Sequence, residues 1–500
     1  MKKDRILVLN VISSVVLQIV LVINGFVLPR LILNYFGSEV NGLVSSLNQF
    51  LGYIQLLEGG LSGVILSTLY KPLAEHDSSR INTVVKTAQS FFRKIGIAYI
   101  CYAILVGVIY PLVIKSSFSF TYIFLLTVIL TITLFTQYYF SLPYRLLLQA
   151  DQKLYIVSIS QIIITVVNLI LAIISLKIYP SIHILKFVGG VMFFVQPVIF
   201  YNYVKKHYKL NLSVNLDNTA LSQRWDGFGQ NLAYFIHTNT DAVVISFFMT
   251  LNDVSIYTIY FLVANSLKNL IIAVSTAIIP KLGLQLHGDN KEHLSDSFGK
   301  YEYIMLAISS LAYSCAICLT TPFVMVYTSG VSDADYYQPL FCVILMLAEL
   351  VYCMRDPYVS ITYAAGHFKQ TAKYAYTEAM MNIVISVILI QFFGIIGVAI
   401  GTLVSMLYRL IAHVLYSSKN ILNRNPLLAF KSLGTFILCP IIAVLGMSYL
   451  TSMLNSLLLI VIAGFVLMVV FAMMIIIISA IFHRSTLRFV KEKILPTTRK

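Results

Sequence analysis

The sequence predicts an all-α integral membrane protein, with about 14 transmembrane helices that form two six-helix lobes followed by two C-terminal helices. Composition is the first observation: 59% of the 500 residues are hydrophobic, only 11% are charged, and the mean hydropathy is +0.85. Soluble globular chains carry roughly 25% charged residues. Long apolar runs and an uneven distribution of basic residues are the other two observations. Together they exclude a water-soluble globular protein.

Apolar runs long enough to cross a bilayer recur along the whole chain. We expect spans at residues 6–28, 41–66, 92–114, 120–142, 155–177, 182–204, 228–250, 255–279, 301–325, 338–362, 376–393, 395–417, 431–451 and 456–482. The first run has no small-residue cleavage site at its end, so we interpret it as a retained span. The eleventh and twelfth spans are separated only by Phe393–Gly397, where glycines favour a tight turn.

Basic residues fall mainly in alternate loops, among them Lys71, Arg145, Lys205, Arg355 and Lys419. The opposite loops hold only Arg30, Lys115, Lys177 and Lys186. By the positive-inside rule, both termini are predicted to be cytoplasmic, which requires an even number of spans. The net charge of +15 is therefore interpreted as a topology signal, and no nucleic-acid partner is expected.

The chain is predicted to contain two related halves. Gly37–Leu43 resembles Leu251–Tyr257, and Arg145–Lys153 with the later Asn168 resembles Tyr363–Lys369 with the later Asn382. Chance similarity between apolar helices is the alternative. The predicted domains are an N-terminal lobe (1–205), an amphipathic cytoplasmic linker that holds the only tryptophan (206–226), a C-terminal lobe (227–417), and two extra helices with a basic tail (418–500).

Polar side chains recur at helical spacing within several spans. The candidates for the lining of a shared cavity are Asn10, Gln18, Asn48, Gln55, Glu58, Asn231, Asn265 and Glu349. Hydrogen bonding between helices is the alternative interpretation, and it suffices for isolated Ser and Thr residues. Stripes in the first two spans of both halves favour a water-filled cavity.

Ionisable residues inside the spans are the sharpest signal, because each costs roughly 2.5–3.5 kcal/mol at a lipid-facing helix centre. One interpretation is internal pairing, such as Glu349 with Arg355 or Asp241 with Lys268. The other is a cationic cavity for an anionic substrate, formed by Arg30, Lys268, Arg355 and Arg409. Arg30 and Arg355 also fit ordinary snorkelling residues at helix ends.

His237 and Asp241 lie one helical turn apart and are candidates for coupling to protons or sodium ions. A buried, structurally satisfied histidine is the alternative. No catalytic triad, phosphate-binding loop or metal-ligand cluster is recognisable in the sequence, so neither enzymatic activity nor a cofactor is expected. The CxxC of Cys315 and Cys318 has no partner pair and is interpreted as two buried apolar residues.

Several motifs resemble one family. They are Leu28-Pro29-Arg30, Glu58-Gly-Gly-Leu61, Asp241 followed by Asp253-Val-x-x-Tyr257, and the block Ala365-Gly366, Asn382–Ser386 and Phe393–Ile400. The chain resembles polysaccharide flippases of the multidrug/oligosaccharidyl-lipid/polysaccharide exporter superfamily, and in particular bacterial O-antigen and capsule repeat-unit translocases. The pair Glu58-Gly59 departs from the Asp-x-Gly expected there, which puts the role of this acid in doubt.

This resemblance implies a V of two lobes around a central cavity that opens alternately to each side. It implies a bacterial cytoplasmic (inner) membrane location and transfer of undecaprenyl-diphosphate-linked oligosaccharide repeat units from the inner to the outer leaflet. Membrane lipids, protons or sodium ions, and polysaccharide assembly proteins are the expected partners. A cation-coupled multidrug antiporter of the same superfamily is the main alternative. A membrane polymerase or ligase is less favoured, because the longest predicted outer loop, near 326–338, holds acids but no Arg or His.

Overall fold

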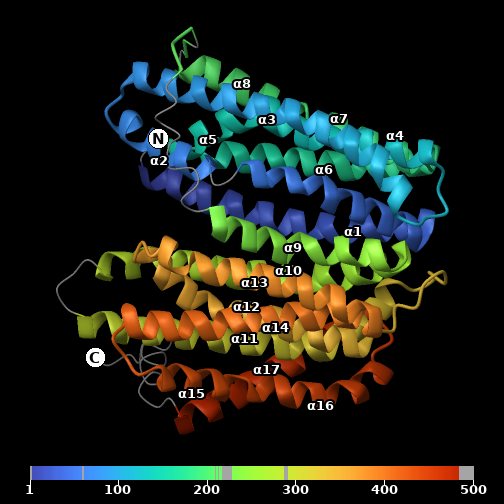
Figure 1. Ribbon diagram of the computed structural model, residues 1–500, viewed down its shortest axis with the longest axis vertical. Helices are drawn as coiled ribbons and strands as arrows, with labels where there is room; N and C mark the ends of the chain where they lie inside the picture. Colours follow the sequence, from blue (N-terminus) through green and yellow to red (C-terminus); the bar gives the residue numbers. More distant parts are fainter. Residues whose placement is uncertain are drawn as a thin grey trace. The chain divides into compact units, whose positions relative to one another are not determined.

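The computed structural model describes residues 3–58, 61–208, 210–211, 213–216, 228–286 and 291–482 (Figure 1). Throughout these ranges the regular structure is helical, with one short 3-10 segment and one short π segment. The chain divides into two compact units. One comprises Met1–Phe235 with Met249–Ser255, and the other comprises Ile236–Phe248 with Ile256–Lys500. We call them the N-terminal and the C-terminal unit.

The N-terminal unit contains the first half of the helices. They are α1 (Lys3–Gly52), η1 (Tyr53–Leu57), α2 (Leu61–Ala74), α3 (Ser78–Val113), α4 (Phe120–Thr136), η2 (Gln137–Ser141), α5 (Leu142–Ala150), α6 (Leu154–Ile178), α7 (Ile182–Met192) and α8 (Val195–Tyr208). Within this unit α1 packs on α6, and α4 packs on α3 and α7.

The second half of the chain contains helices that are longer on average. They are α9 (Phe228–Phe248), α10 (Leu251–Leu286), α11 (Lys291–Tyr327), α12 (Pro339–Ala364), α13 (Phe368–Phe393), α14 (Ile395–Asn420), α15 (Pro426–Phe436), α16 (Leu438–Met453) and α17 (Leu457–Phe482). The first residues of α9 and α10 belong to the N-terminal unit, and the rest forms the C-terminal unit. Here α12 is buried along most of its length, packed between α11 and α14.

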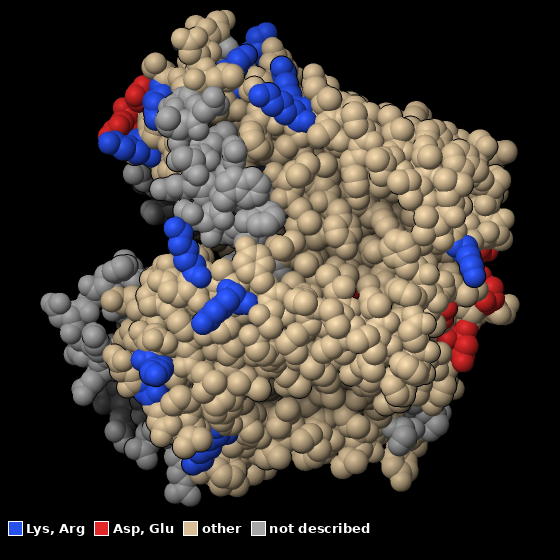
Figure 2. Space-filling model, viewed as in Figure 1, with Lys and Arg blue, Asp and Glu red and all other residues tan. Residues whose placement is uncertain are grey.

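The predicted fold class is confirmed: the helices follow one another in the order of 14 expected spans, with short breaks inside several of them. Among the described residues, 11 helices are long and apolar enough to cross a membrane. In the view of Figure 2, Lys, Arg, Asp and Glu lie toward the ends of the helices, and the surface between them is nearly uncharged. The chain is a multi-pass membrane protein.

The boundary between the first two spans differs from the expected one. The predicted end at residue 28 is wrong, because α1 continues through Pro29 and breaks only at Gly37. Gly37 has a φ of 81°, which a residue without a Cβ adopts readily. The predicted second span, 41–66, is likewise interrupted by η1 before α2 begins at Leu61.

Other helices extend beyond the apolar run that predicted them. The third span was expected from residue 92, yet α3 begins at Ser78, where the Asp77 carboxylate accepts a hydrogen bond of 3.0 Å from the Arg80 backbone N–H. Such a cap satisfies one of the free N–H groups in the first helical turn. Hydropathy therefore located the membrane-crossing part of α3, and its polar extension depends on the cap.

The tight turn predicted between the eleventh and twelfth spans is present. α13 ends at Phe393, Gly394 has a φ of 56°, and α14 starts at Ile395. The two helices then approach closely, because a Cβ at Gly397 would lie only 2.3 Å from the Leu389 carbonyl oxygen. This helical hairpin positions several of the polar side chains described below.

Replacing Gly397 with alanine should destabilise the hairpin, because the new methyl group would collide with the Leu389 backbone, which cannot move aside as a side chain can. We expect a loss of about 1–3 kcal/mol, the usual cost of overpacking, measured as a lower Tm of the purified protein in detergent. Gly446→Ala in α16 is the matched control, since a Cβ there meets nothing within 4 Å. It should leave the Tm unchanged or raise it, and an equal Tm for both variants would contradict the close packing.

Candidate functional site

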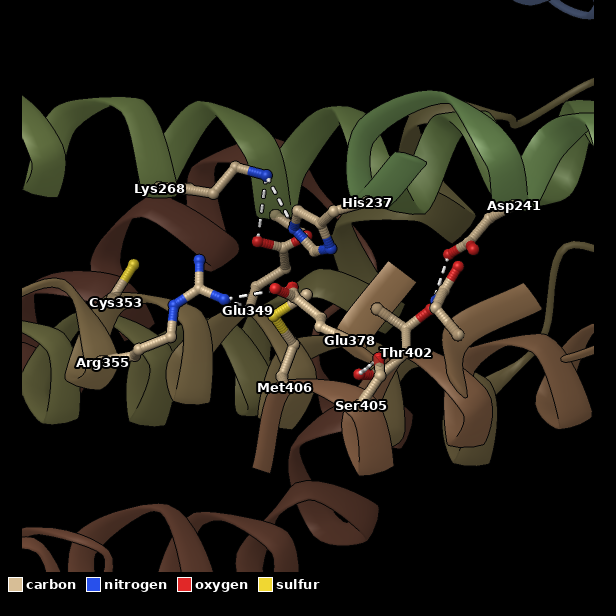
Figure 3. Close-up of polar contacts among 12 residues, drawn as sticks. His237, Asp241, Lys268, Glu349, Cys353, Arg355, Glu378, Thr402, Ser405 and Met406 are labelled. Carbon is tan, nitrogen blue, oxygen red and sulfur yellow. Dashed lines mark hydrogen bonds and ion pairs between the residues drawn. The ribbon is translucent and has the colours of Figure 1, made fainter. Parts of the chain in front are cut away.

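A buried ionic cluster joins three helices of the C-terminal unit (Figure 3). The Nζ atom of Lys268 on α10 lies 3.1 Å from Oε2 of Glu349 on α12, and Nε2 of His237 on α9 lies 3.2 Å from Oε1. Lys268 and Glu349 are fully buried. The two carboxylate oxygens thus each have a nitrogen partner, as a buried charge requires.

A second cluster lies on the same helix α12 and reaches α13 and α14. Nη1 of Arg355 donates to Oε1 of Glu378 at 3.1 Å, and Arg409 donates to Oε2 of the same carboxylate. Arg355 also contacts the sulfur of Met406 at 3.4 Å. One carboxylate therefore contacts two guanidinium groups in the interior of the unit.

Tyr352 connects the two clusters. Its ring stacks on the His237 imidazole with centroids 4.9 Å apart. The Lys268 ammonium lies 5.0 Å from the ring centroid, and the Arg355 guanidinium lies 4.4 Å from it. Cations at these distances are attracted by the aromatic ring. Histidine, tyrosine and three cations thus form one continuous polar region with Glu349 and Glu378.

Asp241 belongs to a third group of polar side chains. Its Oδ2 accepts hydrogen bonds from the Tyr257 hydroxyl at 3.1 Å and from the Thr402 hydroxyl at 2.8 Å. Asn382 donates to Thr402 at 2.9 Å, and its own buried Oδ1 has no hydrogen-bond partner among the described residues. Carboxylate, hydroxyl and amide oxygens are the ligands that hard cations prefer.

The structure changes the pairings expected from the sequence. The predicted pairs Glu349–Arg355 and Asp241–Lys268 are wrong: Glu349 binds Lys268 and His237, while Asp241 binds hydroxyl groups. Residues six positions apart point to different sides of a helix, so Glu349 and Arg355 are not neighbours. His237 and Asp241 likewise belong to different clusters, although they lie one turn apart.

Two acids that bind arginines, Glu378 and Glu302, were not identified from the sequence. Glu378 was placed at the edge of a span predicted to begin at residue 376, but α13 begins at Phe368, which carries Glu378 into the interior. Glu302 on α11 accepts two hydrogen bonds from Arg424, at 2.7 and 2.8 Å. Glu302 and Glu378 fall inside the predicted spans 301–325 and 376–393, and an acid inside a span was the signal that could have identified both.

The predicted residues of the N-terminal unit are not drawn into one cluster. The Asn10 side chain donates to the Gln152 carbonyl at 2.7 Å and accepts from the Tyr155 backbone N–H at 2.8 Å, so it ties α1 to the turn before α6. Glu58 accepts hydrogen bonds from the hydroxyls of Ser62 and Tyr138.

The remaining candidates are less constrained. Gln18, Asn48 and Gln55 are exposed, Asn265 is partly buried on α10, and the side chain of Asn231 lies outside the described residues. Arg30 lies partly buried inside α1 instead of at a helix end. Two roles stay predictions. One is substrate binding by Arg30, Lys268, Arg355 and Arg409, and the other is ion coupling by His237 and Asp241. Trp225 and most of the predicted linker 206–226 also fall outside the described residues.

Solved structures resemble this arrangement over nearly the whole chain. The lipid II flippase MurJ, in an inward closed conformation, superposes with a TM-score of 0.72 at 16% identity, covering 95% of this chain and 99% of its own. The chain has the fold of the MurJ and MATE transporters. An inward-facing multidrug resistance transporter of the MATE family and MOP superfamily gives 0.67 at 13% identity, covering 81% of this chain and 94% of its own.

The MurJ/MATE fold of this chain is also matched by the Vibrio cholerae MATE transporter VcmN, with a TM-score of 0.56 at 15% identity over 85% of this chain and 98% of its own. The sequence itself matches no protein-family model and no curated protein. Identities this low establish the shared fold alone. The neighbours are transporters, in line with the absence of any catalytic motif from the sequence.

Proposed function

We propose that this protein is a flippase that moves undecaprenyl-diphosphate-linked oligosaccharide from the inner to the outer leaflet of the bacterial cytoplasmic membrane, for surface polysaccharide synthesis. The match to the lipid II flippase carries the proposal, because it spans 95% of this chain, against 81% and 85% for the two MATE transporters. That extent fits the two spans beyond twelve that the sequence predicts.

The cargo itself demands a polar path. A diphosphate and a chain of sugar hydroxyls lose several kcal/mol per unpaired group in hydrocarbon. A hydrated path that opens alternately to each side of the membrane would replace the lost water contacts. Membrane lipids and other polysaccharide assembly proteins are the partners that this function requires, with both termini in the cytoplasm.

We further propose that Asp241 binds the coupling ion. Asp241 combines a buried carboxylate with the hydroxyls of Thr402 and Tyr257 and with the free Oδ1 of Asn382. A sodium ion fits this set of oxygens, and a proton on the carboxylate is the alternative occupant. His237 contacts Glu349 and not Asp241, so we leave it out of the proposed ion site.

Transport in reconstituted vesicles tests the function. Vesicles would contain an isoprenyl-diphosphate saccharide with a fluorescent sugar, and a membrane-impermeant quencher would report how much of it reaches the outer leaflet. Protein-containing vesicles should expose the inner-leaflet pool within the assay, and protein-free vesicles should not. Gradient-driven accumulation of ethidium with no movement of the lipid would instead establish the multidrug antiporter and overturn the flippase.

A further inference from the structure

A partly open cavity of about 310 Å3 lies in the N-terminal unit, between α1, α3, α4, α6 and α7. Part of its wall is apolar, supplied by leucine, alanine and phenylalanine side chains. The polar part consists of Asn48, Tyr99, Thr133, Asn168 and Lys186. No carboxylate occurs among the described residues that line it.

Two glycines of α7 lie on the wall of this cavity. Lys186, Gly189 and Gly190 lie on one face of the helix, at i, i+3 and i+4. A Cβ at Gly189 would lie 3.1 Å from Oδ1 of Asn168, and a Cβ at Gly190 would lie 3.2 Å from Cβ of Ile132. The glycines therefore let α7 approach its neighbours, with the side chains of Lys186 and Asn168 on the cavity wall.

Lys186 differs from the cations of the C-terminal unit in the groups that surround it. Lys268, Arg355 and Arg409 each contact a buried carboxylate, whereas no ion pair to Lys186 occurs within the described part of the chain. A charged side chain inside a span is costly unless it faces water or a partner of opposite charge. An anion in the cavity would supply the missing counter-charge.

Snorkelling is the ordinary alternative for a lysine near a helix end. Lys177 illustrates it, since it lies exposed in the last turn of α6. Lys186, by contrast, is partly buried and lines the cavity, together with groups that donate hydrogen bonds. The ammonium has three donors and no acceptor, and the two asparagine amides and the Thr133 hydroxyl add further donors.

We propose that this cavity is a phosphate-binding site, in which Lys186 supplies the counter-charge and Asn48, Asn168 and Thr133 donate hydrogen bonds to the phosphate oxygens. The phosphate belongs either to the isoprenoid diphosphate of the cargo or to free inorganic phosphate. The first source rests on the proposed function, and the binding chemistry is shared by both. Asn168 corresponds to Asn382 in the predicted repeat, so the two halves would bind ions of opposite sign.

Binding to the purified full-length protein tests the site. The probes are farnesyl diphosphate, inorganic phosphate and uncharged farnesol, and the readouts are Kd and the ligand-induced shift of Tm. Wild type should bind at least one phosphate probe and not farnesol. Lys186→Gln should weaken that binding at least tenfold, and Lys186→Arg should retain most of it. Lys177→Gln is the matched control and should bind as wild type does.

Each outcome decides the proposal. Binding of farnesyl diphosphate alone identifies the lipid as the source, and equal binding of inorganic phosphate identifies the free ion. Unchanged binding in Lys186→Gln, or no phosphate-dependent shift of the wild-type Tm, overturns the site. If Lys186→Gln does not fold, Asn168→Leu applies the same criterion. Failure of the proposed function would appear separately, as a wild-type protein that binds phosphate but moves no lipid in vesicles.

Discussion

Replacing Glu378 with glutamine is expected to prevent stable folding of the C-terminal unit. The carboxylate is in contact with both Arg355 and Arg409, which are 4% and 3% exposed. Without it, two buried guanidinium groups lose the carboxylate that both of them contact. Breaking a buried ion pair by removing one partner costs about 3–5 kcal/mol, a large part of the 5–15 kcal/mol that usually stabilises a domain. The measurement is the yield and Tm of monodisperse protein in detergent.

A matched control separates this effect from the loss of any carboxylate. Glu75→Gln removes an exposed acid whose only ion pair among the described residues is with Lys71, at 3.8 Å. Surface pairs contribute about 0–1 kcal/mol, so this variant should be indistinguishable from wild type. Changing Glu378 to leucine together with both arginines to methionine should restore part of the lost stability, because the carboxylate and the two cations that contact it are then removed together. A Glu378→Gln protein as stable as wild type would disprove this role of the carboxylate.

Asp241→Asn is expected to abolish ion-driven transport while the protein still folds. Asparagine has the shape of aspartate, and its carbonyl oxygen still accepts hydrogen bonds from Thr402 and Tyr257. It carries no charge and cannot take up a proton. An imposed sodium or proton gradient should therefore no longer accelerate transport, and the rate should fall to that measured without a gradient. The readout is the transport rate in vesicles with each gradient applied separately.

Asp253→Asn is the control for this experiment, because Asp253 makes local contacts at the start of α10, where it accepts hydrogen bonds from the backbone and hydroxyl of Thr250. Its gradient response should equal that of wild type. The gradient that accelerates the wild-type protein identifies the coupling ion. A full gradient response in Asp241→Asn would leave Asp241 with a structural role alone.

The sequence predicted the local features of the fold well. Apolar runs located the spans, because a helix must supply about 20 apolar residues to cross the hydrocarbon. The turn at Gly394 could be predicted because glycine tolerates positive φ. The break at Gly37 was missed, since Pro29 and Arg30 suggested a helix end that the structure does not contain. Proline alone does not end a transmembrane helix when its neighbours satisfy the freed backbone groups.

The candidate site was predicted only in part. Lys268, Glu349 and Arg409 were recognised as charges inside spans, because any ionisable residue there needs a partner. Arg355 was expected near a helix end, yet it is buried within α12. The partners of these residues were not recognised, since a side chain on one helix gives no information about which remote helix packs against it. Glu378 shows the limit most clearly: its depth depends on where α13 begins, and its role depends on α12 and α14.

By itself, then, the amino-acid sequence determined that this chain is helical, crosses the membrane many times and holds charges that cannot face lipid. These properties follow from hydrophobicity, which acts residue by residue. Only the tertiary structure decided that Glu349 binds Lys268, that Glu378 joins two arginines and that Lys186 lines a cavity. Those contacts depend on how helices distant in the sequence pack together, because an ion pair forms only where packing brings the two charged groups into contact.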